Sequence, residues 1–271
     1  MNRFVFATHR GGSSILGDLA KRCAQLNGIS STALGSQTEA LPEVGPTGAA
    51  KRIAATQDAR EAFVPQVENW RQHAGVFSPI RRADFFPAEF FAPGDLALLN
   101  MRDPRDCMVS GYFGFLRLHG NGLQDADKKA QYEMGIDAYV LTHMLGRYSK
   151  ALNDYMALRK QIPDMTVLHY EEMVTSFDSW FEKFYDALHF ARHNGGGKYM
   201  ISQHAQHLIG ISPYQRLLRR YRKDFIPPKA ENIDRHHRQQ TPGDYARKLQ
   251  PDTIAKINAR LSEPLRYFGY A

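Results

Sequence analysis

Residues 9–14 (HRGGSS) combine side-chain types that bind an anion at the start of a helix. They follow the apolar run 3–8 and precede apolar residues at helical spacing, which predicts a strand, a glycine turn and a helix. A helix N-terminus offers unpaired backbone N–H groups, and glycine lets the backbone approach an oxyanion closely. The arginine adds a fixed positive charge and the serines add hydroxyl donors. The anion-binding residues predicted here are Arg10, Gly11, Gly12, Ser13 and Ser14.

This first loop differs from the nucleotide-binding motifs with comparable chemistry. A Walker A loop places lysine directly before serine or threonine at its end, whereas the basic residue comes first here. The dinucleotide-binding pattern GxGxxG is also absent from the loop. A plain strand-to-helix turn with serine capping explains the segment equally well, so the loop alone leaves an anion site and a structural turn open.

A second arginine-containing segment, residues 102–113 (RDPRDCMVSGYF), follows the apolar run 95–101. A guanidinium can bind phosphate through two hydrogen bonds, which suits Arg102 to an anion at the end of a strand. The alternative is a salt-bridged turn in which an aspartate caps the following helix. The remaining charged residues of the turn are interpreted mainly as structural: Asp103, Arg105 and Asp106.

The elements that must hold these segments alternate between strands and helices. Short apolar runs predict buried strands at 3–8, near 29–34, at 95–101 and at 165–170. A long amphipathic helix is predicted over 136–160, and residues 76–77 form only a short apolar step before Pro79. This alternation predicts an α/β fold with a central parallel sheet flanked by helices, in a single domain over residues 1–271.

The composition is that of a globular protein with a basic excess. Hydrophobic residues are 43% of the 271, which supports a full core and excludes fibrous and disordered classes. Two cysteines cannot form a disulfide framework, no run of about 18 apolar residues exists, and the N-terminal apolar run is too short for a signal peptide. We therefore expect a cytoplasmic protein. The net charge of +7 predicts an anionic partner without naming it.

Segment 102–113 resembles the 3′-phosphate motif of the sulfotransferases that use 3′-phosphoadenosine 5′-phosphosulfate (PAPS). In that family an arginine at a strand end and a serine eight positions later bind the 3′-phosphate, and Arg102 and Ser110 have this spacing. Residues 9–14 resemble the family's 5′-phosphosulfate loop, PKSGTT, with Arg10 at the position of the lysine.

Two later segments resemble the same family in the same order along the chain. Residues 169–173 (HYEEM) resemble its Tyr-Glu-Asp segment, which implies that Tyr170 lies near the adenine. Residues 238–245 (RQQTPGDY) resemble its late Arg-Lys-Gly segment, with glutamines in place of the lysine and the glycine. The resemblance implies further donor contacts from Arg238, Gln239 and Gln240. The terminal Gly269 and Tyr270 also resemble the family's ending.

The resemblance also implies a P-loop nucleotide-kinase-like fold and a reaction. A sulfuryl group would pass from PAPS to a hydroxyl or amine in an in-line displacement, with adenosine 3′,5′-bisphosphate (PAP) as product and no metal. Arg10 would stabilise the departing phosphate oxygen. The cytosolic branch of the family has a histidine before its 3′-phosphate strand, and residues 75–81 contain none. His73 is therefore the first candidate for the general base and Glu39 the second.

The acceptor is not specified by the sequence. A carbohydrate is the first expectation and a small hydroxylated metabolite the second. Mobile loops near 35–60, 117–135 and 191–200 are expected to shape its pocket. The oligomeric state is open.

Two other functions compete with sulfuryl transfer. A P-loop-like nucleotide kinase shares the first loop but requires a Gly-Lys-Ser/Thr sequence, which is not evident. A nucleic-acid-binding protein would use the basic stretch 216–238, where eight lysines and arginines outnumber three acids and supply +5 of the net +7. Its stacking surface would be Tyr214, Tyr221 and Phe225. We expect no nucleic-acid partner, because a multiply anionic donor such as PAPS also explains the charge.

Overall fold

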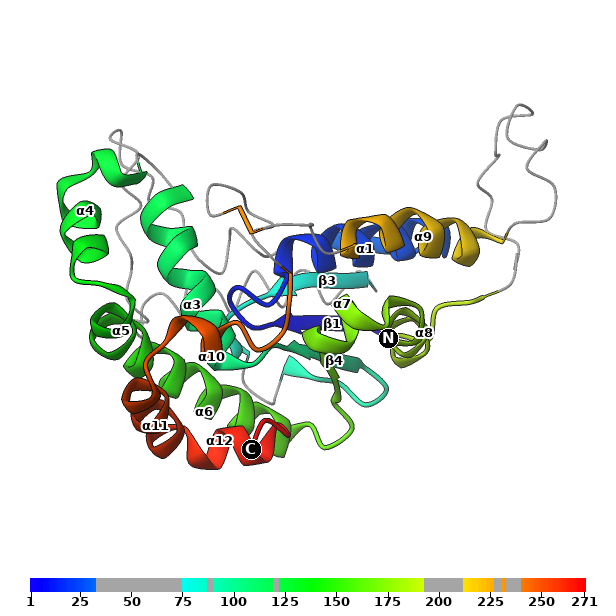
Figure 1. The fold of residues 1–271 in the computed structure, drawn as a ribbon. Coiled ribbons are helices and arrows are strands. Elements are labelled where there is room, and N and C mark those ends of the chain that lie inside the picture. Colours follow the sequence, from blue (N-terminus) through cyan, green and yellow to red (C-terminus); the bar gives the residue numbers. More distant parts are fainter. Residues whose placement is uncertain (33–74, 87–89, 119–121, 193–211, 227–230, 233–239) are drawn as a thin grey trace, which may run out of the picture.

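A computed structural model of the chain describes residues 1–32, 75–86, 90–118, 122–192, 212–226, 231–232 and 240–271 (Figure 1). Its centre is a parallel sheet of five strands in the order β2-β3-β1-β4-β5. The strands are β1 (Arg3–Ala7), β2 (Ser30–Thr32), β3 (Gly75–Ile80), β4 (Leu96–Met101) and β5 (Thr166–His169). Parallel strands place their carboxyl ends along one edge of the sheet, where ligands of open α/β folds bind. The predicted α/β fold is confirmed.

Strand β3 differs from the prediction of a short apolar step at residues 76–77. It extends over Gly75–Ile80 between β2 and β1, and all six of its residues are buried. The pairing register with β1 shifts between Phe4 and Phe6, which leaves one extra residue in β3. The bulge includes Pro79, and proline has no N–H to donate to a strand ladder. The sequence pattern therefore misses this central strand, because a proline normally marks an edge or an end.

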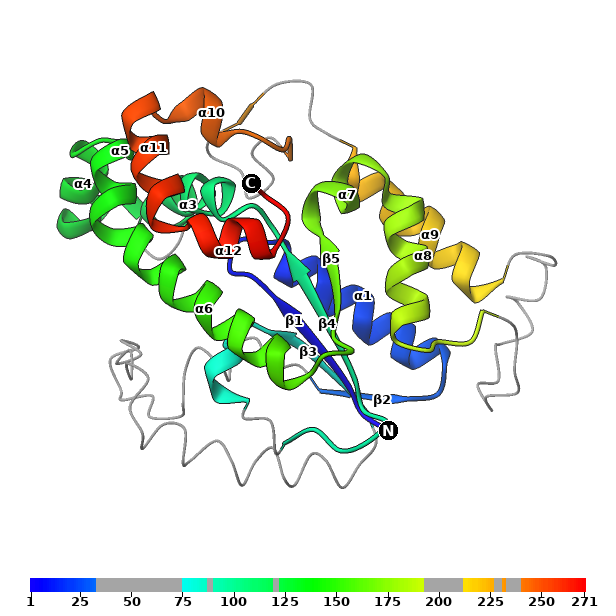
Figure 2. The ribbon, with the colours of Figure 1, turned by 90° about the horizontal axis from the view of Figure 1, so that it is seen from below.

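Helices cover both faces of the sheet (Figure 2). Successive strand residues point to opposite faces, so Val5 and Ala7 face one helical layer while Phe4 and Phe6 face the other. The first layer contains α1 (Ser13–Leu26), α7 (Tyr170–Thr175), α8 (Phe177–Ala187) and α9 (Pro213–Arg222). The second layer contains α3 (Pro104–Phe113), α4 (Ala126–Glu133), α5 (Ile136–Tyr139), α6 (Leu145–Gln161), α10 (Tyr245–Lys248), α11 (Pro251–Arg260) and α12 (Ser262–Tyr267).

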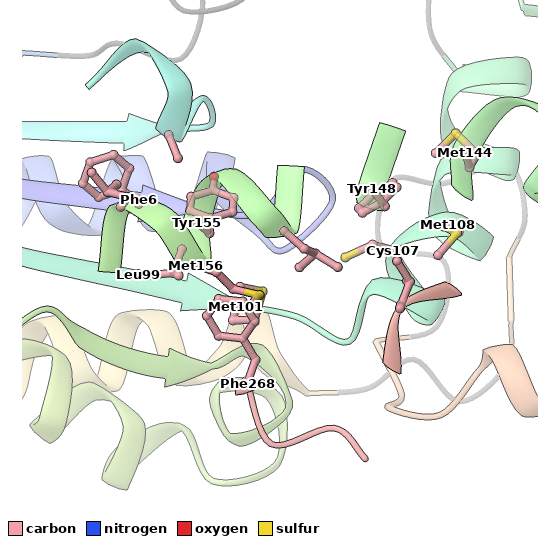
Figure 3. Packing of buried hydrophobic residues seen from close by; sticks show 14 of the residues in the cluster. Phe6, Leu99, Met101, Cys107, Met108, Met144, Tyr148, Tyr155, Met156 and Phe268 are labelled. Atoms are coloured by element: carbon pink, nitrogen blue, oxygen red, sulfur yellow. The ribbon is translucent and has the colours of Figure 1, made fainter. Parts of the chain in front are cut away.

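The core of the second layer fixes α3 and α6 against the strands (Figure 3). Tyr155 and Met156 of α6 lie near Phe6 and Met101 of the strands. Cys107 of α3 is fully buried, and burial raises the pKa of its thiol to about 12. Such a thiol stays protonated and packs as a small apolar group. The packed helices hold the loops that precede α3 and α6 in place.

Two predicted segments are more elaborate than expected. The predicted helix over 136–160 consists of α5, a π-helical turn at Val140–Met144, and α6. The predicted loop over 117–135 contains α4, and the Tyr112 hydroxyl donates to the Tyr132 carbonyl at 2.8 Å. No helix in the part of the chain described by the structure is long and apolar enough to cross a membrane.

The aromatic side chains of the basic stretch belong to the core. Tyr221 and Phe225 are 2% and 6% exposed, and the Tyr214 ring stacks on Phe181 at 5.0 Å between centroids. The stacking surface that the nucleic-acid alternative requires is therefore wrong for Tyr221 and Phe225. Tyr221 packs in the core with α9 on α1 and α8, and Phe225, in the turn after α9, stacks on Phe177.

Candidate active site

The first loop turns sharply between β1 and α1, and its glycines are required there. Gly12 ends the loop with φ +78°, and a Cβ at Gly11 would lie 2.4 Å from Thr8 Oγ1. Asn100 of β4 donates from Nδ2 to the Gly11 carbonyl at 3.2 Å. Trp180 Nε1 in turn donates to Asn100 Oδ1 at 3.1 Å, so a buried amide fixes the loop to the sheet.

Arg10 turns from this loop toward α3. Its Nε donates to Ser110 Oγ at 3.2 Å, although 100 residues separate the two. A Cβ at Gly114 would lie 2.3 Å from Arg10 Nη2, so the guanidinium packs closely against the backbone of Gly114 in this arrangement. Burial lowers the pKa of Arg10. The structure thus joins the basic residue of the first motif to the serine of the second.

Arg102 lies at the centre of the site and is 8% exposed. Its Nη1 donates to the Arg10 carbonyl at 2.9 Å, and its Cζ lies 4.6 Å from the ring centroid of Tyr170. Among the described residues its Nε has no hydrogen-bond partner. A buried charged N–H without a partner is costly, so a bound anion is the natural acceptor for it. The N–H donors and the positive charge of Arg102 both suit a phosphate oxygen.

Neighbouring strands explain why Arg102 and Tyr170 meet. Met101 of β4 is paired with His169 of β5, and each is followed at once by its site residue. Tyr170 is 7% exposed and also lies against the loop, because a Cβ at Gly12 would be 3.1 Å from its ring. The sequence spacing alone could not show this, since it depends on the register of two strands.

The charged residues after Arg102 are structural, as expected. Asp103 caps α3 by accepting from the Arg105 N–H at 2.9 Å, and its carboxylate also binds the Arg105 guanidinium. Asp106 is 1% exposed and accepts from the backbone N–H groups of Gly243 and Tyr245, each at 2.9 Å. Asp106 therefore holds the late segment 240–245 beside α3, a role that the sequence did not reveal.

A carboxylate and a tyrosine from the chain end support the same turn. Glu171 accepts from the Asp103 N–H through Oε1 and from the Tyr270 hydroxyl through Oε2, both at 2.9 Å. Burial raises the pKa of Glu171. The Tyr270 hydroxyl also lies 3.0 Å from His169 Nδ1. The only sequence signal for Tyr270 was the resemblance of residues 269–270 to the family's ending.

The structure does not place all of the remaining predicted site residues beside Arg10 and Arg102. Ser13 is buried and its Oγ accepts from Arg81 Nε at 2.9 Å, whereas Ser14 is exposed. The Gln240 amide donates to the Asp224 carbonyl at 2.9 Å. Four candidates lie outside the described residues: His73, Glu39, Arg238 and Gln239.

A cavity of about 420 Å³ adjoins the first loop. It lies between the end of β1, the segment after β3, and helix α6. Its polar lining comprises Thr8, His9, Arg81, Arg82, Asp84, Arg147, Lys150 and Asp154. This cavity could not be predicted from the sequence, because three segments far apart in the chain contribute to it. The described residues contain no group of three histidine, cysteine or acidic side chains that could hold a metal ion.

Comparison with known proteins gives one family and a set of related folds. The sequence model described as "Sulfotransferase domain" matches residues 82–261, roughly two thirds of the chain. The structure of mouse sulfotransferase SULT7A1 complexed with PAP aligns over 98% of this chain and 84% of that chain, with a TM-score of 0.56 and 13% identity. Retinol dehydratase in a complex with retinol and PAP aligns over 98% and 81%, with a TM-score of 0.47 and 14% identity. No curated protein sequence matches the chain.

Proposed function

Because the chain belongs to the sulfotransferase family, we propose that it transfers the sulfuryl group of PAPS to a hydroxyl or amine and releases PAP. The family match confirms the resemblance predicted from residues 102–113. It begins at residue 82, so the first loop at 9–14 lies outside it. The proposed role of that loop therefore depends on its geometry, above all on the contact between Arg10 and Ser110.

The observation that carries the proposal is the buried Arg102 guanidinium with an N–H that lacks a described partner. We propose that Arg102 and Ser110 bind the 3′-phosphate and that residues 10–14 bind the 5′-phosphosulfate. Tyr170 would contact the adenine from its place beside Arg102. The late segment would add the contacts predicted for Arg238, Gln239 and Gln240. No metal is proposed for the reaction.

The proposed reaction is a single in-line displacement. An acceptor oxygen forms a bond to sulfur while the bond from sulfur to the bridging phosphate oxygen breaks, and the electron pair leaves on that oxygen. Arg10 stabilises the developing charge by its own charge and its N–H groups. An arginine keeps its proton, so it acts here as a hydrogen-bond donor and not as an acid. Positioning and electrostatic stabilisation supply most of the catalysis.

A general base takes the proton of the acceptor hydroxyl. We propose His73 first and Glu39 second, as the sequence suggests. The cavity adds His9 as a third candidate, because it lines that space and directly precedes Arg10. Its ring lies 5.2 Å from the Phe115 ring, between centroids. We propose a carbohydrate or a small hydroxylated metabolite as the acceptor.

Calorimetric binding of PAP tests the donor site. We expect the Arg102→Ala variant to bind PAP about a hundredfold more weakly, because charge-assisted hydrogen bonds contribute about 1.5–3 kcal/mol each. Arg159→Ala, on the far end of α6, is the matched control and should bind normally. Because Arg102 also supports the loop, Ser110→Ala provides a milder second variant with a weaker effect. A wild-type protein that binds Mg²⁺-ATP but not PAP would contradict the proposal and favour a kinase.

Transfer of label from PAPS to a panel of glycans and small alcohols then tests the reaction and the base. Variants His73→Ala, Glu39→Ala and His9→Ala are compared at saturating PAPS. The variant that loses about a hundredfold or more in kcat while keeping PAP affinity identifies the base. Wild-type kcat in all three variants would exclude each of these residues as the general base.

A further inference from the structure

The cavity beside the first loop has an apolar floor and a charged rim. Its floor is formed by Ala83, Tyr148, Ala151, Leu152 and Tyr155. The Tyr148 hydroxyl donates to the His9 carbonyl at 3.0 Å and the Tyr155 hydroxyl to the Ala7 carbonyl at 3.0 Å. These bonds fix helix α6 to the end of β1. The cavity is therefore a preformed space directly next to the residue that precedes Arg10.

Four cations and two carboxylates line the cavity, so its formal charge is +2. Both carboxylates are already paired: Arg82 binds Asp84 at 2.6 Å, and Lys150 binds Asp154 at 2.6 Å and Asp84 at 3.4 Å. These four residues form one neutral network. Of the two remaining cations, Arg81 already donates from Nε to Ser13 Oγ at 2.9 Å, so Arg147 is the one considered as a ligand group.

Arg147 connects this charge to the reaction centre. Its Cζ lies 5.7 Å from the centroid of the Phe115 ring, and the Cζ of Arg10 lies at the same distance from the same ring. The side chain is exposed, and within the described ranges no carboxylate pairs with it. Two guanidinium groups of like charge therefore approach one ring, one from the loop and one from the cavity.

We infer that the cavity binds the acceptor and that this acceptor carries an anionic group, a carboxylate or a sulfate, bound by Arg147. The inference rests on the proposed sulfotransferase function and adds the class of acceptor. The tyrosine and leucine floor receives the ring of a sugar or a phenol, and the rim arginine selects for the charge. A neutral acceptor would leave the Arg147 guanidinium without a carboxylate or sulfate to bind, so it would gain nothing from this contact.

Two acceptor pairs that differ only in charge test this inference. One pair is a uronic-acid-containing oligosaccharide and its methyl ester, and the other is 4-hydroxybenzoate and its methyl ester. Transfer from labelled PAPS and calorimetric binding to the protein with PAP bound are measured for each compound. We expect at least one acid to exceed its ester about tenfold or more in kcat/KM, the effect of one hydrogen bond to a charged group. The pair that responds separates a glycan acceptor from a small aromatic one.

The variants locate the effect at Arg147. Arg147→Gln should reduce the preference for the acid to near unity and leave PAP affinity unchanged, and Arg147→Lys should restore part of the preference. Arg159→Gln is the matched control, because it lies on the same helix and its Cζ is 5.3 Å from the ring of Tyr267. Its preference should equal that of the wild type.

The outcomes separate this inference from the proposed function. If the protein binds PAP but transfers equally to acid and ester in both pairs, or binds them equally, the anionic acceptor is overturned. The proposed sulfotransferase function is then unaffected. A preference for the acid that survives in Arg147→Gln would overturn the assignment to Arg147. Absence of both PAP binding and transfer would overturn the proposed function and the inference together.

Discussion

The charged residues after β4 and those around the cavity differ in how they are held. Asp103 and Arg105 have side chains only 10% exposed, and Arg105 also donates to Asn258 and to the Tyr270 carbonyl. At the cavity, the side chains of Arg82 and Lys150 are 32% and 61% exposed. Buried pairs keep one geometry, whereas solvated pairs exchange partners at little cost. The proposed donor side is thus built as a rigid frame, and the proposed acceptor side as a rim that can adapt.

The largest expected effect concerns Arg10, which lies where the two sides meet. In the Arg10→Ala variant we expect kcat to fall by about 10²–10³, because a preorganised donor at the departing oxygen contributes most in the transition state. PAP affinity should change much less, since Arg102 and Ser110 remain. Single-turnover transfer from labelled PAPS measures the step directly. Arg10→Lys, which restores the residue of the family's loop, should keep most of the rate; an unchanged rate in Arg10→Ala would contradict the assigned role.

The difference in burial can be tested by removing one arginine from each side. Arg105→Ala leaves the buried Asp103 carboxylate without its guanidinium, and we expect the free energy of unfolding to fall by about 3 kcal/mol. Arg82→Ala removes a solvated partner of Asp84, and the expected loss is below about 1 kcal/mol. Urea denaturation measures both. Similar losses for the two variants would remove the distinction between rigid frame and adaptable rim.

A second substitution shows whether the unpaired Asp103 carboxylate causes the larger loss of stability in Arg105→Ala. In an Arg105→Ala background, Asp103→Asn removes the unpaired carboxylate charge. It keeps an oxygen that can accept from the backbone N–H of residue 105 at the start of α3. The double variant should therefore be more stable than Arg105→Ala alone. A further decrease would mean that the Asp103 charge stabilises the start of α3 even without the Arg105 guanidinium.

The residues proposed for the donor side could be selected from the sequence because their spacing is local. Arg102 and Ser110 lie eight positions apart across one strand-to-helix turn. The first loop is equally local, since Gly11 and Gly12 are required by the turn itself. What spacing could not give is the contact of Arg10 with Ser110, which depends on β1 and β4 being neighbours.

The cavity proposed as the acceptor site could not be predicted, because its parts are remote in sequence. His9, Arg81 and Arg147 meet only through the packing of α6 against the end of β1. Strand β3, which carries Arg81 to the cavity, was itself concealed by Pro79. Asp106 is a similar case, since an acid in a charged turn gives no sign that it caps a segment 137 residues away.

The smallest expected effect concerns His169, on the border of the rigid frame. The Tyr270 hydroxyl gives its proton to Glu171, so His169 must present Nδ1–H to the tyrosine oxygen. Burial lowers the pKa of His169 below its ordinary value. The unfolded chain therefore binds a proton first as the pH falls through about 6.5, the usual histidine value, and the folded state loses stability from there down to the lowered pKa.

His169→Gln keeps an N–H donor for Tyr270 but removes the titration. At pH 7.5 the variant and the wild type should differ little in free energy of unfolding, and below pH 6.5 the wild type should lose stability relative to the variant. The difference between the two curves isolates this histidine from the buried Glu171, whose raised pKa contributes a slope of opposite sign. Parallel curves would show that His169 is protonated equally easily in both states, and that the frame around β5 admits more water than its hydrogen bonds indicate.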